Sequence, residues 1–303
     1  MKVADLPAGA VARRLRHGGL DLRLGPFIAR IESPIPAVTE GITQLWAEAA
    51  VVERGFADFH VRLAPPAGLR RWFRPQVLFE FDGAAPFLPL PREQAFAFLE
   101  WGLNWCVANH AHQYLVIHAA AVERHGGVAI LPAPPGSGKS TLCAGLIARG
   151  WRLLSDELTL VSLATGKVAP LPRPVSLKNE SIEVIRRFAP DAVLSAPCHD
   201  TTKGNVAHMR PPATSTARDG EEAAAAWILF PRFRAGAPLE LGERSRARTF
   251  MAVVENGFNY HVLGGDGFDA VATLVDRCGC FDLTYGDLTE AVATMDRLAQ
   301  EQQ

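Results

Sequence analysis

Short hydrophobic or alternating runs, separated by turn residues, fill the chain from Leu20 to about Leu90. Runs of this kind predict β-strands, and the dipeptide Asp82-Gly83 predicts a tight turn after the last of them. A helix is expected near Glu40–Val52. The region therefore predicts a small β-rich α+β domain. Its expected strands are Leu20–Leu24, Phe27–Ile31, Phe59–Leu63 and Val77–Phe81.

A segment with helical periodicity follows this region. Pro91 suits the first position of a helix, because its missing N–H costs nothing there. A broad apolar face then runs from Phe96 to Cys106. We interpret the segment as a core helix that joins two domains. The predicted division is residues 1–112 for the β-rich domain with its linking helix, and 113–303 for a second domain.

Strands and helices alternate in the second part, which predicts an α/β domain. A glycine-rich loop separates a strand at Val128–Leu131 from a helix at Lys139–Arg149, and Gly150 fits the left-handed position that ends a helix. The other expected strands are Leu115–Val122, Trp151–Leu154, Ala226–Phe230 and Phe281–Tyr285. Helices are expected at Ser181–Phe188 and Thr289–Ala299, and a strand followed by a helix within Asn259–Arg277.

The glycine-rich loop carries the clearest chemical signal. It reads Ala-Pro-Pro-Gly-Ser-Gly-Lys-Ser-Thr over residues 133–141, in the strand–loop–helix context that a P-loop requires. Backbone N–H groups at such a helix N-terminus surround phosphate oxygens. Lys139 is expected to reach the β- and γ-phosphates of ATP, and Ser140 to ligate Mg²⁺. The predicted binding residues are Gly136, Ser137, Gly138, Lys139, Ser140 and Thr141, because the prolines before them cannot donate N–H groups.

Two adjacent acids, Asp156 and Glu157, follow Lys139 by 17 and 18 residues. One helix and one strand separate them from the loop, so both carboxylates are expected beside the phosphate site. Neighbouring residues at a strand end point in opposite directions, which suits two roles. One acid can accept a proton from an attacking hydroxyl while the other holds Mg²⁺. The alternative is that they only cap the next turn.

Basic residues in loop-like stretches after the acids are candidates for contacts to the transferred phosphate. Phosphoryl transfer needs positive groups, because charge spreads over three oxygens in the transition state. The chain has only five lysines, and two lie in these stretches. Ordinary solvated charges are the alternative. The candidates are Arg173, Lys178, Lys203, His208 and Arg210.

Charge and composition exclude several classes of function. The net charge of −1 gives no basic excess, so neither a nucleic acid nor an anionic membrane is an expected partner. Five scattered cysteines predict no disulfide framework, and the close pair Cys278 and Cys280 lacks a second pair for a zinc site. The N-terminus has no signal-peptide core, and no run is long enough to span a membrane. These features predict a cytoplasmic protein.

His118, the P-loop and the stretch Arg149–Glu157 together resemble the catalytic core of HPr serine kinase/phosphorylase, and more closely the HPr-kinase-related proteins. The resemblance is specific from about Arg74 to Pro212, and weaker outside that span. It includes the segments Leu99–Cys106, Arg173–Asn179 and Lys203–His208.

The resemblance implies a fold shared with PEP carboxykinase, with Asp156 as the catalytic base and His118 close to it. On residue type alone, a single histidine on an apolar strand is more often a core residue. Two features differ from HPr kinases: Glu157 stands where they have Asp, and proline-rich Pro170–Pro174 replaces their Glu-Ile-Arg-Gly-type loop. HPr as substrate and the reverse reaction are therefore not implied. HPr kinases form hexamers, so a homo-oligomer stays an open alternative.

The sequence thus predicts an HPr kinase/PEP carboxykinase-type P-loop domain after a smaller β-rich domain. We expect ATP and Mg²⁺ as cofactors, with Ser140 and Glu157 on the metal, Asp156 as base and His118 assisting. The expected acceptor is a Ser or Thr of a small protein or peptide. A kinase for small-molecule hydroxyls and a nucleotide-binding scaffold with little turnover are the alternatives.

Overall fold

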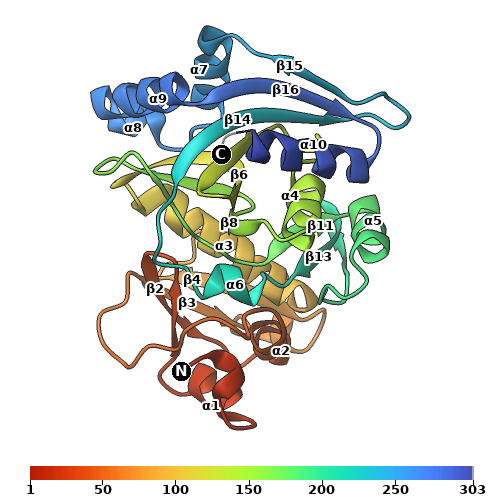
Figure 1. Cartoon of the computed structure of the whole chain (residues 1–303). Helices are drawn as coiled ribbons and strands as arrows, with labels where there is room; N and C mark the ends of the chain where they lie inside the picture. Colours follow the sequence, from red (N-terminus) through yellow and green to blue (C-terminus); the bar gives the residue numbers. More distant parts are fainter. Residues whose placement is uncertain (302–303) are drawn as a thin grey trace.

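The computed structural model describes residues 1–301 and has a mixed α/β fold built on two large sheets and one small one. The N-terminal elements lie at the bottom of Figure 1, and the long strands of the largest sheet lie at the top. Within residues 1–301, no helix has the length and apolar character needed to cross a membrane.

The N-terminal sheet has five strands in the order β1-β2-β3-β4-β5. Its first four strands confirm those predicted from the hydrophobic runs, and Asp82 and Gly83 both adopt positive φ in a turn after β4. The strands are β1 (Leu20–Leu24), β2 (Phe27–Glu32), β3 (Phe59–Ala64), β4 (Gln76–Phe81) and β5 (Leu90–Pro91). The helices of this part are α1 (Ala10–Arg16), α2 (Pro36–Leu45) and α3 (Ala95–His110).

Two helix predictions in this part are wrong in their bounds. The helix expected near 40–52 is α2, which begins at Pro36 and ends at Leu45. Proline at the first helical position explains the earlier start. Residues 50 and 51 instead form bridges to the N-terminus and to β1. The linking helix α3 begins at Ala95 and not at Pro91, because Arg92–Gln94 form a 3₁₀ turn first.

The largest sheet has eight strands, with the path β10-β9-β6-β7-β14-β16-β15 and β8 paired to β6. Strands β7, β14 and β16 run parallel to one another. The strands are β6 (Tyr114–Arg124), β7 (Gly127–Pro132), β8 (Arg152–Ser155), β9 (Leu158–Ser162), β10 (Val168–Ala169), β14 (Ala224–Phe233), β15 (Glu240–Glu243) and β16 (Gly279–Tyr285).

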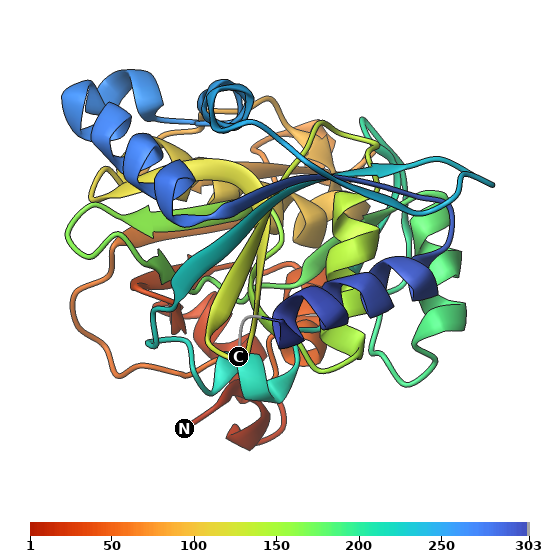
Figure 2. The same ribbon diagram turned by 45° about the horizontal axis from the view of Figure 1, so that its top comes forward.

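Helices cover both faces of this sheet, because alternate residues of its central strands point to opposite sides. On β6, Ala120 and Val122 join the core under α4 and α10, whereas Ile117 and Ala119 join the core under α7 and α9. Figure 2 shows α10 and α4 on one side of the strands and α8 and α9 on the other. These helices are α4 (Lys139–Ala148), α7 (Arg246–Glu255), α8 (Tyr260–Leu263), α9 (Gly265–Arg277) and α10 (Leu288–Gln300).

The strand expected at the start of Asn259–Arg277 is wrong, since helices α8 and α9 fill that segment. Helix α7 and strand β9 were not predicted. A third sheet, in the order β11-β13-β12, lies beside α4 and completes the fold. Its elements are β11 (Val175–Lys178), β12 (Cys198–Thr201) and β13 (Gly204–Met209), with α5 (Glu180–Phe188) before β12 and α6 (Ala213–Thr216) after β13.

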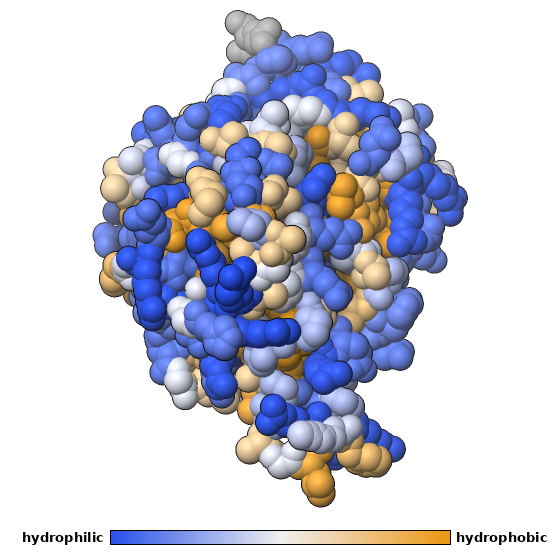
Figure 3. All heavy atoms as spheres, turned by 90° about the horizontal axis from the view of Figure 1, so that it is seen from below, coloured by the Kyte–Doolittle hydropathy of each residue, from blue (hydrophilic) through white to orange (hydrophobic). Residues whose placement is uncertain are grey.

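Helix α3 ties the N-terminal part to the larger sheet. Its buried side chains share one hydrophobic core with β1–β4 and also with Leu158, Leu160 and Leu171. The division at residue 112 stays a prediction, but one continuous core spans it. Seen from below, the molecule presents a mostly hydrophilic surface with smaller apolar areas between the polar ones (Figure 3).

Candidate functional site

The glycine-rich loop lies at the carboxyl ends of three parallel strands. Strand β7 leads directly into it, and the ends of β14 and β16 hold it in place. Phe233 N donates to Ser137 O at 2.9 Å, and the Tyr285 hydroxyl donates to Gly138 O at 3.1 Å. In open α/β sheets, ligands bind outside the carboxyl ends of parallel strands. The loop therefore occupies the edge where a ligand is expected.

Gly138 is required by this arrangement. Its φ is +90°, and a Cβ at this position would lie 2.5 Å from the Tyr285 hydroxyl oxygen. Helix α4 begins at the next residue, and Leu142 N is the first amide of the helix that donates to a backbone carbonyl within residues 1–301. The amides of Lys139, Ser140 and Thr141 are thus free to bind a ligand.

The acids occupy the connection between β8 and β9. Both strands pair with β6, so that Ser155 lies opposite Ala121 and Leu158 lies opposite His118. Asp156 and Glu157 therefore lie near His118 of β6 and near α4, which packs against the same strand. Strand β9, which the sequence prediction missed, fixes this geometry.

Asp156 and Lys139 are buried together beside Ser140. Asp156 Oδ2 accepts hydrogen bonds from Ser176 N at 3.0 Å and from Ser140 Oγ at 3.2 Å. Burial raises the pKa of Asp156 although the Lys139 charge lowers it, and burial lowers the pKa of Lys139 although Asp156 and Glu157 raise it. Asp156 Oδ1, Lys139 Nζ and Ser137 Oγ are buried without a hydrogen-bond partner among the described residues.

Glu157 is held ionised at neutral pH by the lysines around it. Burial raises its pKa, but the charges of Lys178, Lys139 and Lys203 together outweigh burial and lower the pKa to about 2. Lys178 Nζ lies 3.3 Å from Glu157 Oε1, and Asn104 Nδ2 donates to Glu157 Oε2 at 2.7 Å. The two adjacent acids are thus tuned in opposite directions, a pattern seen in acid–base sites.

His118 is half-buried on β6, with its ring edge-on to Phe258 and its backbone N–H bonded to Asn256 O at 2.7 Å. Burial, followed by the charge of Lys139, lowers its pKa to about 4. The ring is therefore neutral at pH 7 and can accept or donate one proton. The charges of Lys139 and Glu157 both shift the pKa of His118, so the ring interacts electrostatically with the lysine of the loop and with one of the two acids.

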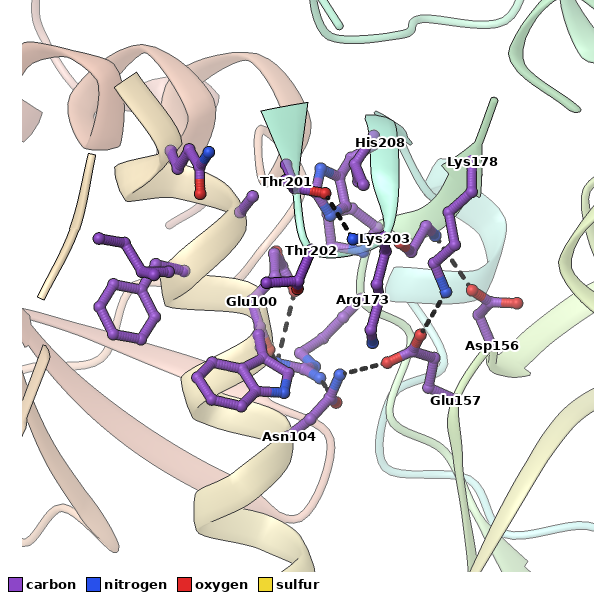
Figure 4. A pocket seen from close by; sticks show the side chains of 18 of the residues that line it. Glu100, Asn104, Asp156, Glu157, Arg173, Lys178, Thr201, Thr202, Lys203 and His208 are labelled. Atoms are coloured by element: carbon purple, nitrogen blue, oxygen red, sulfur yellow. Dashed lines mark hydrogen bonds and ion pairs between the residues drawn. The ribbon is translucent and has the colours of Figure 1, made fainter. Parts of the chain in front are cut away.

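A cavity of about 170 Å³ opens beside the acids, between α3 and the β11–β13 pair (Figure 4). Phe98 and Trp101 of α3 line one side. Four of the five predicted basic residues line the cavity, and the fifth, Arg210, does not; its backbone N–H is bonded to Val193 O. The four are Arg173, Lys178, Lys203 and His208.

These four residues differ in their surroundings. Arg173 is buried against Glu100, and burial raises the pKa of that carboxyl to about 7 although Arg173 lowers it. His208 is buried edge-on to Phe96, and burial lowers its pKa to about 4. Lys203 is exposed at the cavity mouth. Lys178 and Lys203 are therefore the two cations of the set best placed to meet a ligand from solvent.

Asn104 and Ser176 contact the acids, but they were not singled out in the sequence. Asn104 reaches Glu157 across 53 residues, and Ser176 bonds Asp156 through its backbone N–H. Neither contact joins residues that are close in sequence, so no local sequence pattern predicts it. Both residues do lie within segments that carry the family resemblance, which was the available signal.

Comparison with known proteins assigns the chain to no family. No family model matches the chain, and no curated protein matches it. Within residues 1–301, no group of three or more His, Cys, Asp or Glu side chains has the arrangement of a metal site. The candidate site therefore rests on its own residues.

Proposed function

We propose that the chain is a P-loop phosphotransferase that binds ATP with magnesium at Gly136–Thr141 and transfers the γ-phosphate to a hydroxyl group. The proposal includes the HPr kinase-type catalytic domain that the motifs resemble. The observation that carries it is the buried pair of Lys139 Nζ and Asp156 Oδ1, whose charges interact and neither of which has a hydrogen-bond partner in the described chain. A buried polar group left unsatisfied costs about 1–3 kcal/mol, so two such groups beside the loop favour a ligand that satisfies them.

The residues at the loop fit a magnesium-bound triphosphate. Lys139 and the free amides at the start of α4 would contact phosphate oxygens, and Ser140 with Glu157 would hold the ion. A hydroxyl has two lone pairs besides its proton, so Ser140 can ligate a metal while donating to Asp156. Two protein ligands suffice, since Mg²⁺ keeps waters and substrate phosphates as its other ligands. When bound, the ion would neutralise charge on the phosphates.

Asp156 is the proposed base. Its raised pKa makes it a stronger proton acceptor than an ordinary aspartate, and Oδ1 has no hydrogen-bond partner among residues 1–301. In the reaction, the acceptor oxygen bonds to the γ-phosphorus and the bond from phosphorus to the bridging oxygen of ADP breaks. The hydroxyl proton passes to Asp156. Neutral His118 would assist by holding a proton or a phosphate oxygen near the same acid.

A Ser or Thr of a small protein or peptide is the acceptor class that the resemblance implies. The cavity favours a second candidate, a small molecule with a hydroxyl group. Its volume of about 170 Å³ is close to the roughly 150 Å³ that accommodates benzene in an engineered core. Aromatic residues of α3 form one wall, so the N-terminal part contributes to a pocket of amino-acid or sugar size.

Incubation with γ-labelled ATP tests the proposal and separates the two acceptor classes. The protein is mixed with the low-molecular-mass fraction of a cell extract, with the protein fraction, or with neither. Transfer of label into a phosphate ester in either fraction, lost in Asp156→Asn, supports a kinase. Tight ATP binding with no Asp156-dependent transfer or hydrolysis would instead favour a nucleotide-binding scaffold.

A further inference from the structure

A residue from the N-terminal part holds one of the two acids. Asn104 lies on α3, at the cavity wall, and its Nδ2 donates to Glu157 Oε2 at 2.7 Å (Figure 4). Glu157 belongs to the connection between β8 and β9, 53 residues after Asn104 in the sequence. This contact joins helix α3 directly to the proposed magnesium ligand.

The amide of Asn104 can point in only one direction. Its Oδ1 accepts from Arg173 Nη2, and a guanidinium has donors only. The amide oxygen must therefore face Arg173, which leaves the NH₂ group to face Glu157. An asparagine whose two ends have chemically different partners is fixed in orientation.

Arg173 is itself held by Glu100, one turn before Asn104 on α3. Arg173 Nη1 lies 3.4 Å from Glu100 Oε2 and 3.3 Å from the Glu100 carbonyl oxygen. The other carboxylate oxygen, Oε1, accepts from Trp46 Nε1 at 2.7 Å. The chain of contacts from Trp46 to Glu157 thus starts in the core of the N-terminal part and ends at the site.

Glu157 has two side-chain partners, and they would respond differently to a metal ion. Lys178 neutralises the carboxylate, so a bound cation competes with it. Asn104 is neutral and donates a single hydrogen bond, so it can keep its contact while Glu157 binds a cation. Partners of this kind orient metal ligands, and their loss typically lowers metal affinity about 10–100-fold.

We propose that Asn104 is a positioning residue that, fixed by Arg173, holds the Glu157 carboxylate in the orientation that binds magnesium with the nucleotide. The inference rests on the proposed function. It gives the N-terminal part a defined task, which is to complete the metal side of the site through α3.

The test measures ATP affinity by calorimetry, with and without Mg²⁺, in the full chain. We compare the parent with Asn104→Ala, Asn104→Asp and the matched control Asn109→Ala. Asn109 lies on the same helix and is exposed, and its side chain bonds to Trp105 O alone among residues 1–301. We expect Asn104→Ala to reduce the gain in affinity that Mg²⁺ provides about tenfold or more, with Mg²⁺-free affinity unchanged. Asn104→Asp, which places a carboxylate beside Glu157, should reduce the gain further, and Asn109→Ala should match the parent.

The possible results distinguish a failure of the positioning role of Asn104 from a failure of the proposed function. If the parent shows no Mg²⁺-dependent ATP binding, the proposed function fails. If the parent binds but Asn104→Ala equals Asn109→Ala, the positioning role is overturned. Equal loss with and without Mg²⁺ also overturns it, because a merely structural defect acts on both. Should Asn104→Ala unfold, Arg173→Lys serves instead: it keeps the charge but removes the fork that fixes Asn104, and an unchanged Mg²⁺ gain would contradict the proposal.

Discussion

Ser140 Oγ donates a hydrogen bond to Asp156 Oδ2 across 3.2 Å, which joins the first turn of α4 to the connection between β8 and β9 that carries the two acids. The same carboxylate oxygen accepts from Ser176 N. Two donors thus fix one oxygen of Asp156 and leave the other, Oδ1, without a partner among residues 1–301. Asp156 is therefore the side chain on which the proposed function depends most.

Replacing Lys139 by Met should separate ligand binding from stability. The ammonium group is buried and unpartnered, so its removal should leave the thermal midpoint unchanged or higher. ATP affinity should fall about tenfold or more, since a hydrogen bond to a charged group contributes about 1.5–3 kcal/mol. Calorimetry and thermal unfolding of the same samples check both parts. Equal ATP affinity in variant and parent would contradict the P-loop assignment.

Gly138→Ala should damage the loop more than Gly126→Ala damages the β6–β7 turn. Both glycines have positive φ, +90° and +86°, so both variants carry backbone strain of about 1–3 kcal/mol. Only at Gly138 would the new Cβ meet other atoms, the Tyr285 hydroxyl and Phe233 Cβ; nothing lies within 4 Å at Gly126. We expect a larger loss of unfolding free energy and loss of ATP binding in Gly138→Ala alone. Similar denaturation curves for the two variants would argue against the loop geometry.

Glu157→Gln should raise the Mg²⁺ concentration needed for half-maximal ATP binding, while Mg²⁺-free ATP binding stays close to that of the parent. The amide keeps the shape of the side chain but removes the ionised oxygen pair that Lys178 now neutralises. A magnesium titration of nucleotide affinity measures the change. If Asp156→Asn shows this shift and Glu157→Gln does not, the two acids have exchanged roles.

Protonation of His208 should lower the stability of the protein as the pH drops from about 6.5 towards 4. Burial lowers the pKa of this imidazole to about 4, so between these values the unfolded state binds the proton more strongly than the folded state. The contribution is at most about 3 kcal/mol. Glu100, with a pKa raised to about 7, acts in the opposite sense, because there the folded state holds the proton.

His208→Gln should therefore become more stable relative to the parent as the pH falls from 7 to 4.5. His199→Gln, an exposed position on the neighbouring strand β12, should leave the slope as it is in the parent. Urea denaturation at several pH values checks this. A slope that is the same in all three proteins would show that His208 titrates normally.

Much of the fold follows from local patterns in the sequence. The early strands have short apolar runs and a good turn, and Gly150 adopts the left-handed position just after α4, as the sequence predicts. Gly150 has φ +92°, its N–H bonds to Ile147 O, and Trp151 N bonds to Leu146 O, which together cap the helix. The glycine-rich loop could likewise be located from residue types alone, because Gly136 and Gly138 adopt positive φ there.

The remaining features depend on contacts between distant parts of the chain. Strand β9 has only five residues, which is too short for a 2-residue period to identify it. It is a strand because it pairs with β6, whose Ile117 lies 42 residues before its partner Thr159. The Asn104–Glu157 contact requires α3 to pack beside the β8–β9 connection. Propensity and periodicity describe neighbours in sequence, and they contain no information on that packing.

Dependence of turnover on Asp156 is the most direct test of the central claim. ATP hydrolysis in the absence of an acceptor, with water in place of the acceptor hydroxyl, is measured in the parent, in Asp156→Asn and in His118→Ala. The account predicts slow hydrolysis in the parent, a loss of about 10²–10⁴-fold in Asp156→Asn, a smaller loss in His118→Ala, and unchanged ATP affinity in both. The two losses should be non-additive in the double variant. Parent protein that binds ATP yet hydrolyses it no faster than Asp156→Asn, with or without acceptor fractions, would contradict the claim.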